Sequence, residues 1–231
     1  MQPLSIGQWI GYPLKHEIKI LLRSKSRWMQ PVLFFCLLVT LFPMGLGAST
    51  QTIVLLMPTL IWIAVILSAL WSAESAFQFD LEHGALEQMM LSSYPLWLWL
   101  LIRGFAYWLI VIFPMVLMGP ALAWLFGLSE QVVLILACTL CLGTPGLTLL
   151  ALIASGLTVC LRHQGLLLVL MMLPLLIPFV IFGVGSVNLI LMGIWPRSEL
   201  AWLGALSTLV LTLGPFAGSL GIQYSLDDSL S

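Results

Sequence analysis

Acidic residues and a histidine form the only group of charges near the middle of the sequence. Asp80, Glu82, His83 and Glu87 lie between two long apolar blocks. Carboxylates and imidazole are costly to place in hydrocarbon without partners, so this stretch must lie in water or against another protein. We interpret it as a segment that docks into a partner protein.

The same stretch contains the pattern of a short amphipathic helix. Leu86, Met89 and Met90 have the i, i+3, i+4 spacing of one helix face. Gly84 divides two short helical pieces, of which this is the second, and Pro95 ends it or kinks its exit. The sequence therefore predicts a docking helix with an apolar face and an acidic flank.

Cysteine and histidine side chains do not converge on a metal, haem or redox site in the sequence. Cys138 and Cys141 have CxxC spacing, but their neighbours are Leu, Ile and Ala, which favours ordinary small apolar residues over a redox or metal site. His16, His83 and His163 all map to one edge of the predicted membrane spans. We expect them to face the interface or a partner, and we expect no directly bound metal or cofactor.

The sequence lacks the motif of a nucleotide-hydrolysing loop. That motif requires a glycine followed by lysine and Ser or Thr, and no glycine here precedes a lysine. No HExxH motif or Ser/His/Asp set is evident either. We therefore expect a chain that is not itself an enzyme. We also expect no nucleic-acid partner.

Composition determines the fold class: 61% of the 231 residues are hydrophobic and 7% are charged. About 20 apolar residues span a membrane as a helix. The charge-free runs predict an all-α protein with six membrane spans, because the first run is long enough for two. Five of the eight basic residues precede the first span, which predicts cytoplasmic N- and C-termini. We expect one membrane domain, with spans one and two in 28–73, a cytoplasmic segment in 74–96, spans three to six in 97–221 and a loose cytoplasmic tail in 222–231.

Basic residues are expected to anchor the chain at the membrane interface. Residues 5–27 mix apolar and basic side chains and predict an amphipathic interfacial helix that Pro13 divides, although a plain positively charged flank is the alternative. In span three, an arginine within an aromatic cluster is expected to reach the headgroups. The anchoring candidates are Lys15, Lys19, Arg23, Arg27 and Arg103.

Glycine and proline residues predict helix breaks in two spans. Gly143 and Pro145 interrupt span four, and Pro174 and Pro178 lie within span five. A break at membrane depth requires burial in protein or a water-lined cavity, whereas a kink supported by neighbouring helices is the alternative. In span six, Gly214 and Gly218 have the spacing that allows close helix approach.

Several of these segments resemble known membrane components of ABC transporters. The core from Asp80 to Leu91 is similar to the coupling segment of ABC-2 type permeases, which docks into a cleft of a separate ATPase. More narrowly, the sequence resembles the cytochrome c maturation protein B (CcmB) family. That resemblance rests on residues 41–43, 61–64, 80–87, 142–145 and 173–178.

The resemblance implies a multi-pass component of the bacterial inner membrane, working with a cytoplasmic ABC ATPase, the A protein of the maturation system, and with its membrane proteins C and D. It implies that ATP and Mg²⁺ bind the ATPase, and that the complex handles haem or releases a haem-loaded periplasmic chaperone. Two copies per complex are expected. The segment 80–90 would then receive the ATPase movement, and residues 185–199 are the candidate for its far-side output.

Two other functions fit the same spans. One is an ABC-2 export permease for a lipid, drug or polysaccharide. The other is a membrane scaffold with no moving part.

Overall fold

The computed structural model describes residues 6–23, 25–47, 50–82, 95–158 and 164–230. These residues are almost entirely helical, and no strand occurs among them. The elements are α1 (Ile6–Arg23), α2 (Lys25–Leu46), α3 (Thr50–Glu82), α5 (Leu96–Tyr107), the π-helix η1 (Trp108–Ile112), α6 (Phe113–Leu125), α7 (Glu130–Thr158), α8 (Gln164–Leu191) and α9 (Arg197–Leu230).

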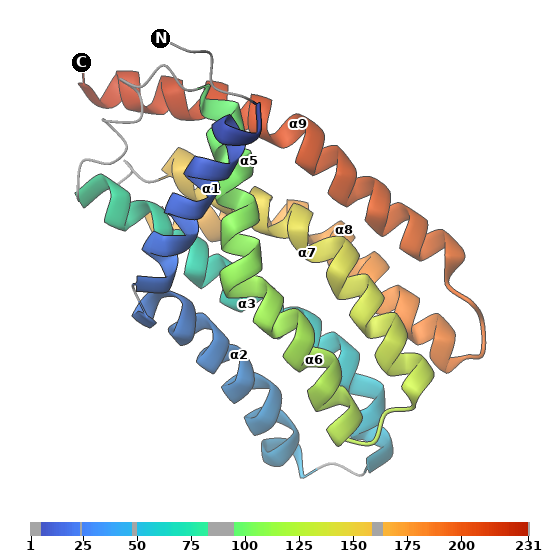
Figure 1. Ribbon diagram of the computed structural model, residues 1–231. Coiled ribbons are helices and arrows are strands. Elements are labelled where there is room, and N and C mark those ends of the chain that lie inside the picture. The colour runs from blue at the N-terminus through green and yellow to red at the C-terminus, as the bar shows by residue number, and fades with distance from the viewer. Residues whose placement is uncertain (1–5, 24, 48–49, 83–94, 159–163, 231) are drawn as a thin grey trace.

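The predicted all-α membrane fold is confirmed. In the described residues, six helical stretches are long and apolar enough to cross a membrane. They are Trp28–Gly45, Thr52–Glu74, Leu96–Leu125, Glu130–Thr158, Gly165–Leu191 and Arg197–Gly221. The third combines α5, η1 and α6, and α1 projects from the bundle at the end where α9 finishes (Figure 1).

Two of the short links between helices contain a glycine with a left-handed backbone, two residues after the helix ends. Gly127 (φ 88°) follows α6, and Gly193 (φ 77°) follows α8. In each link the amide after the glycine donates to a carbonyl five residues back, from Leu128 to Ala123 and from Ile194 to Leu189. This pairing satisfies the last carbonyls of the helix, and the missing Cβ makes the left-handed conformation accessible.

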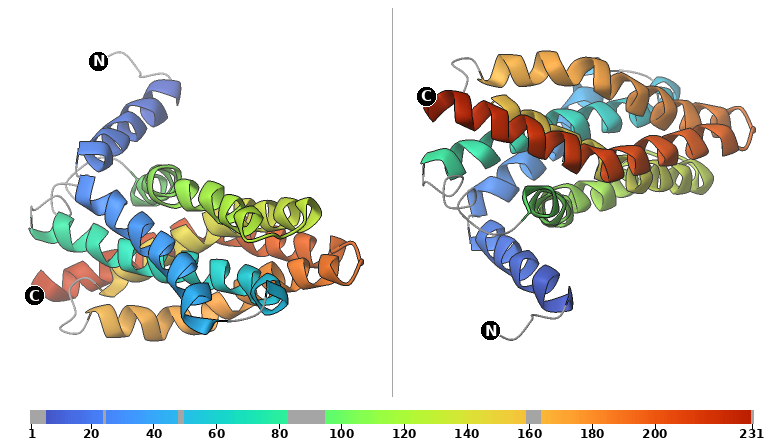
Figure 2. Two further views of the ribbon diagram at one scale, coloured as in Figure 1. Left: turned by 90° about the horizontal axis from the view of Figure 1, so that it is seen from below. Right: turned by 90° about the horizontal axis from the view of Figure 1, so that it is seen from above.

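The spans divide into central and outer helices. In an 18-residue apolar stretch of each span, 56% of the residues are buried in α3, 56% in α5–α6 and 61% in α7. The corresponding shares are 22% in α2, 28% in α8 and 22% in α9. The helix α7 contacts α3, α5, α6, α8 and α9. Figure 2 shows α8 along one outer side of the bundle, on the opposite side from the α5–α6 span.

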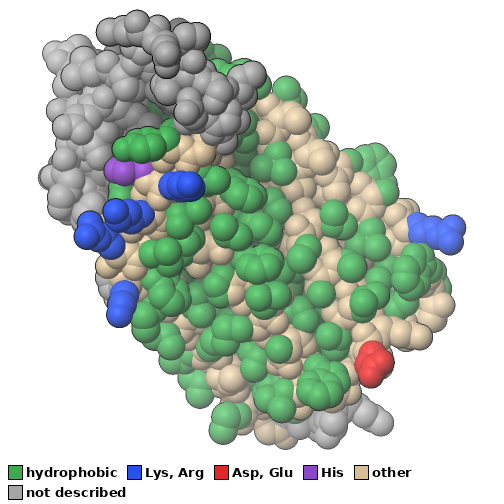
Figure 3. Space-filling view, in the orientation of Figure 1, with side chains coloured by type: hydrophobic (Ala, Val, Ile, Leu, Met, Phe, Trp, Pro, Cys, Tyr) green, Lys and Arg blue, Asp and Glu red, His purple; other side chains and the backbone are tan. Residues whose placement is uncertain are grey.

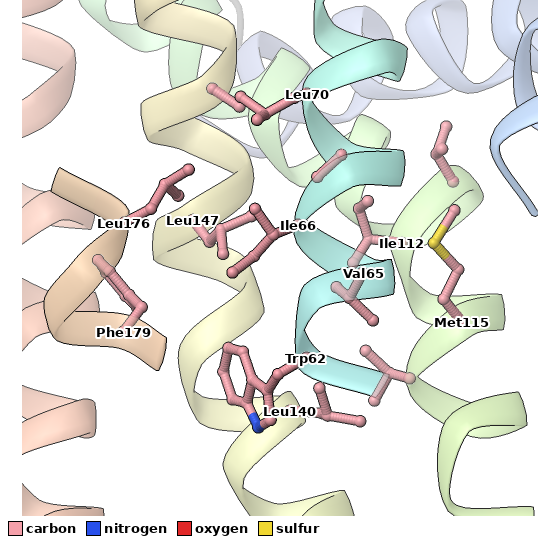
Figure 4. Close-up of a cluster of buried hydrophobic side chains, with 14 of the residues drawn as sticks. Trp62, Val65, Ile66, Leu70, Ile112, Met115, Leu140, Leu147, Leu176 and Phe179 are labelled. Atoms are coloured by element: carbon pink, nitrogen blue, oxygen red, sulfur yellow. The ribbon is translucent and has the colours of Figure 1, made fainter. Parts of the chain in front are cut away.

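Tight packing around Trp62 joins the middle of α3 to α7 and α8. The indole is fully buried among aliphatic side chains (Figure 4). A Cβ added to Gly143 would lie 2.7 Å from Trp62 Cη2, and one added to Gly183 would lie 2.4 Å from Trp62 Cε2. Both glycines therefore provide the space that the indole occupies.

The predicted helix breaks are wrong, because α7 and α8 run unbroken across Gly143, Pro145, Pro174 and Pro178. A proline removes one backbone hydrogen bond, and neighbouring helices supply compensating contacts. Next to Pro145, the Gly146 amide donates to Ser207 Oγ of α9 at 3.1 Å. The alternative interpretation, a helix supported by its neighbours, fits this arrangement.

Other helices are also longer than the sequence predicted. Pro13 lies inside α1 and does not divide it. The segment 185–199 contains the last turns of α8, which continues to Leu191, and the start of α9 at Arg197. Residues 222–230 continue α9 instead of forming a loose tail. Helix formation in these segments satisfies the backbone internally, which is favoured wherever lipid or interface excludes water.

The close approach expected from Gly214 and Gly218 is confirmed. A Cβ on Gly218 would lie 2.9 Å from Ile153 Cγ1 of α7, and one on Gly214 would lie 3.2 Å from Ile153 Cδ1. Small residues on α9 thus let it pack directly against the central helix.

Candidate coupling site

The last turns of α3 lead directly into the segment that the sequence marks as a docking element. The α3 span ends at Glu74, and the helix continues to Glu82. Ala76 and Phe77 are fully buried, so this extension is held by the protein and does not stand free. The described packing of α3 therefore extends as far as Phe77.

Three carbonyls of this helix end accept hydrogen bonds from side chains of α5 and α7. Tyr107 Oη donates to Ser72 O at 2.8 Å, and Ser155 Oγ donates to Ala73 O at 2.7 Å. The guanidinium Nη2 of Arg103 donates to Ala76 O at 3.2 Å. A carbonyl has two lone pairs, so these bonds add to the helical ones. We call this set of three bonds the carbonyl clamp.

Two aromatic rings enclose the guanidinium of Arg103. Its Cζ lies 4.8 Å from the Phe77 ring centroid and 4.7 Å from the Trp99 ring centroid. The two rings meet edge to face, with centroids 6.1 Å apart and planes at 87°. Each cation–π contact contributes about 0.5–2 kcal/mol, more when water is excluded, so the cluster joins α3 and α5.

The N-terminal helix is linked to this cluster. Trp99 Nε1 donates to Glu17 Oε1 of α1 at 3.2 Å. On α1, Leu14, Ile18 and Leu21 pack against the hydrophobic core. The apolar face of α1 therefore packs on α5 and its neighbours, and does not all enter the lipid as the sequence suggested.

The expected headgroup contact of Arg103 is replaced by contacts within the protein. Arg103 is 6% exposed, and among the charged residues whose burial is described no other is buried. The reason is that two ring faces and a carbonyl stabilise the cation there. The sequence held a signal for this, because Trp99, Arg103 and Tyr107 are spaced i, i+4, i+8 on one helix face. Ser155 and Glu17 carried no comparable signal.

Glu74 contacts the start of α8, which the sequence did not predict. A Cβ added to Gly165, in the first turn of α8, would lie 2.5 Å from Glu74 Oε1. The half-buried carboxylate therefore sits against the start of α8. The partial positive charge of a helix N-terminus favours an anion in that place.

The predicted docking residues lie partly outside the described structure. Asp80 and Glu82 belong to the last turns of α3, but their side chains are outside the described set. Gly84, Leu86, Glu87, Met89 and Met90 all lie outside the described residues, as do His83 and His163. Their role in docking stays a prediction.

The remaining candidates lie on the surface of the described helices. Lys15, His16, Lys19 and Arg23 are exposed on α1, and the side chain of Arg27 is not described. Cys138 and Cys141 are exposed free thiols on the outer face of α7. No group of three or more His, Cys, Asp or Glu residues suited to a metal ion is found in the part of the chain that is described.

Comparison with known proteins identifies the family. The model of the CcmB protein family matches residues 12–225. This chain belongs to the CcmB family. Its similarity to heme exporter protein B of Pseudomonas aeruginosa is 39% identity over 215 residues, which cover 93% of this chain and 96% of that protein.

Other CcmB proteins show the same extent of similarity. The heme exporter protein B of Haemophilus influenzae is 37% identical over 215 residues, covering 93% of this chain and 97% of its own. The heme exporter protein B of Escherichia coli K12 is 35% identical over 210 residues, which cover 91% of this chain and 96% of that protein. The carbonyl clamp and the Arg103 cluster thus belong to a CcmB membrane protein, a class of transporter component.

Proposed function

We propose that this chain is the membrane permease of an ATP-driven complex of cytochrome c biogenesis. ATP hydrolysis by a separate cytoplasmic ATPase, the A protein of the system, would drive haem export or release of a haem-loaded periplasmic chaperone. The observation that carries the proposal is the match to heme exporter protein B over more than nine-tenths of the chain. The membrane proteins C and D and a second copy of this chain complete the proposed complex.

The proposed location is the bacterial inner membrane, with both termini in the cytoplasm. Basic residues supporting this orientation are concentrated on α1, and α1 lies at the same end as the end of α9 (Figure 1). ATP and Mg²⁺ would bind the ATPase, and haem is cargo of the complex.

The carbonyl clamp supports a specific route for the energy. The ATPase would bind Leu86, Met89 and Met90 in an apolar groove, with Asp80, Glu82 and Glu87 at its basic rim. Its closure would displace the end of α3. Tyr107 and Arg103 would pass that displacement to α5, and Ser155 would pass it to α7. Packed helices with directional contacts move as units, which makes such transmission mechanically effective.

A deletion strain provides the first test of the function. Loss of the gene should abolish all c-type cytochromes, and the wild-type chain should restore them. Normal c-type cytochromes in the deletion strain would contradict the proposal.

Substitutions in the docking helix test the ATPase contact. Leu86→Ala or Glu87→Lys should reduce co-purification of the ATPase as well as release of the haem-loaded chaperone. Gln88→Ala, on another face of the predicted helix, is the matched control and should leave both unchanged. Full retention of both activities in the first two variants would refute this docking mode.

A further inference from the structure

An apolar groove on the outside of the bundle lies where α1, α5, α7 and α9 meet. Its volume is about 570 Å³, within the ~300–1,000 Å³ range of ligand pockets. Leu98, Leu101, Ile102, Phe105 and Trp108 of the α5–η1 span form one wall, all on one helix face. Leu14 of α1, Pro145 and Leu149 of α7 and Leu211 of α9 complete it.

The lining of the groove is almost entirely apolar. The single polar group of Trp108 is directed away, because its Nε1 donates to Thr144 Oγ1 of α7 at 2.9 Å. Gly104 and Pro145 lie in the lining, and neither has a polar side chain. A polar ligand would find no hydrogen-bond partner along this wall, whereas a hydrocarbon chain needs none.

The length of the groove matches one leaflet of a membrane. Ten residues separate Leu98 from Trp108, which corresponds to about 15 Å along a helix. The hydrocarbon core is ~30 Å thick, so one leaflet contributes about half of that. The groove begins near the N-terminal end of span three, next to α1, and extends along the span as far as Trp108. It therefore has the reach of one acyl chain from the leaflet on the α1 side.

Exposed basic side chains of α1 follow the residue that lines the groove, on the adjacent face of that helix. Leu14 lines the groove, while Lys15 and Lys19, which follow it on α1, are exposed. The one acidic side chain of α1, Glu17, is engaged by Trp99. Figure 3 shows Lys, Arg and His side chains gathered near α1, next to a wide hydrophobic face. Such an arrangement complements an anionic headgroup above an acyl chain.

The same charges argue against a second copy of this chain as the occupant. A two-fold symmetric interface brings the same patch of both copies together. Pairing through this groove would bring two sets of exposed basic side chains from α1 close to one another. Repulsion between them would oppose the dimer, whereas an anionic lipid neutralises the same charges.

We propose that the groove binds one anionic phospholipid from the leaflet on the α1 side. One acyl chain lies along the wall from Leu98 to Trp108, and the phosphate lies near Lys15 and Lys19. The bound lipid holds α1 against α5, next to the Arg103 cluster. This site does not depend on haem export, and its test needs no transport assay.

Native mass spectrometry of the full-length chain tests the proposal. The protein is reconstituted in lipid nanodiscs of phosphatidylcholine with one-fifth phosphatidylglycerol, and lipids retained after release are counted. The wild type should retain one phosphatidylglycerol in preference to phosphatidylcholine. Leu211→Trp fills the groove and should abolish retention. Leu213→Trp, at an exposed position of the same helix, is the matched control and should retain the lipid.

A second pair of variants separates headgroup from acyl chain. Lys15→Gln with Lys19→Gln should lower the preference for phosphatidylglycerol about five-fold per lysine, following ~1 kcal/mol per basic residue at an anionic surface. Arg197→Gln, at the other end of the bundle, should not change the preference. The proposal is overturned if the wild type shows no preference for phosphatidylglycerol. The proposal is also overturned if Leu211→Trp retains the lipid as the wild type does. It is likewise overturned if the wild type shows a dimer peak and no bound lipid, and Leu211→Trp loses that dimer peak.

Discussion

The middle and the end of α3 are held by different kinds of contact. In the middle, Trp62 is enclosed by aliphatic side chains and by the space that Gly143 and Gly183 leave (Figure 4). Its Nε1 and the hydroxyl of Ser68 make no hydrogen bond to the described residues. At the end, three side chains bond to carbonyls, and Arg103 lies between two rings.

This difference in contacts suggests that the middle of α3 mainly determines stability and that its end mainly transmits movement. Helices in lipid gain little from hydrophobic burial against one another, so close packing through glycine supplies much of their association. The middle of α3 should therefore dominate the free energy of unfolding. Hydrogen bonds and cation–π contacts are directional and weaker in sum, so the end of α3 should matter more for the movement that it passes on.

Removing the indole from the middle should have the largest effect on stability. We expect Trp62→Ala to cost about 3–5 kcal/mol, because it leaves a large cavity between three helices. Unfolding of the detergent-solubilised protein, followed by circular dichroism, measures the change. Trp202→Ala, at a position that is 61% exposed, is the control and should cost little. An equal loss of unfolding free energy in both variants would show that the middle of α3 has no special role in stability.

Adding one methyl group next to the indole should have the next largest effect. Gly183→Ala places a Cβ 2.4 Å from Trp62 Cε2, and such overpacking costs about 1–3 kcal/mol. Gly204→Ala on α9 meets no atom within 4 Å and should be neutral or slightly stabilising. The same unfolding assay compares the two. A neutral Gly183→Ala would mean that the indole moves aside freely.

Changing the shape of the cation at the end of α3 should reduce stability less. Arg103→Lys keeps the charge but loses the planar group that stacks on two rings, and we expect a cost of about 1–2 kcal/mol. The exposed Arg197 provides the control, because Arg197→Lys should not alter unfolding. A loss above that of Trp62→Ala would reverse the comparison between the two regions.

Deleting a single hydroxyl of the carbonyl clamp should have the smallest effect on unfolding. Tyr107→Phe removes one bond to Ser72 O, and hydrogen bonds between helices in membranes average about 0.6 kcal/mol. Tyr12→Phe, at a residue that is 78% exposed, serves as the control. Thermal midpoints of the two variants would be compared under identical detergent conditions, and a large drop for Tyr107→Phe would show that the clamp is mainly structural.

The sequence predicted the features that depend on composition and spacing. Apolar runs indicated the six spans, and small residues four apart predicted the contact of Gly214 and Gly218 with α7. It could not predict that α7 runs through Pro145, because the support comes from Ser207, 61 residues away from Gly146. Likewise the spacing of Trp99, Arg103 and Tyr107 placed them on one helix face, but it could not predict the contact of Arg103 with Phe77 of another helix.

The end of α3 is where we expect ATPase movement to enter the membrane, through the carbonyl clamp. The most direct measurement is release of the haem-loaded chaperone per ATP hydrolysed by the purified complex that contains Arg103→Lys with Tyr107→Phe. We expect ATP hydrolysis and assembly to stay near wild type while release falls at least about tenfold. Release at the wild-type ratio in this variant would contradict transmission through the clamp.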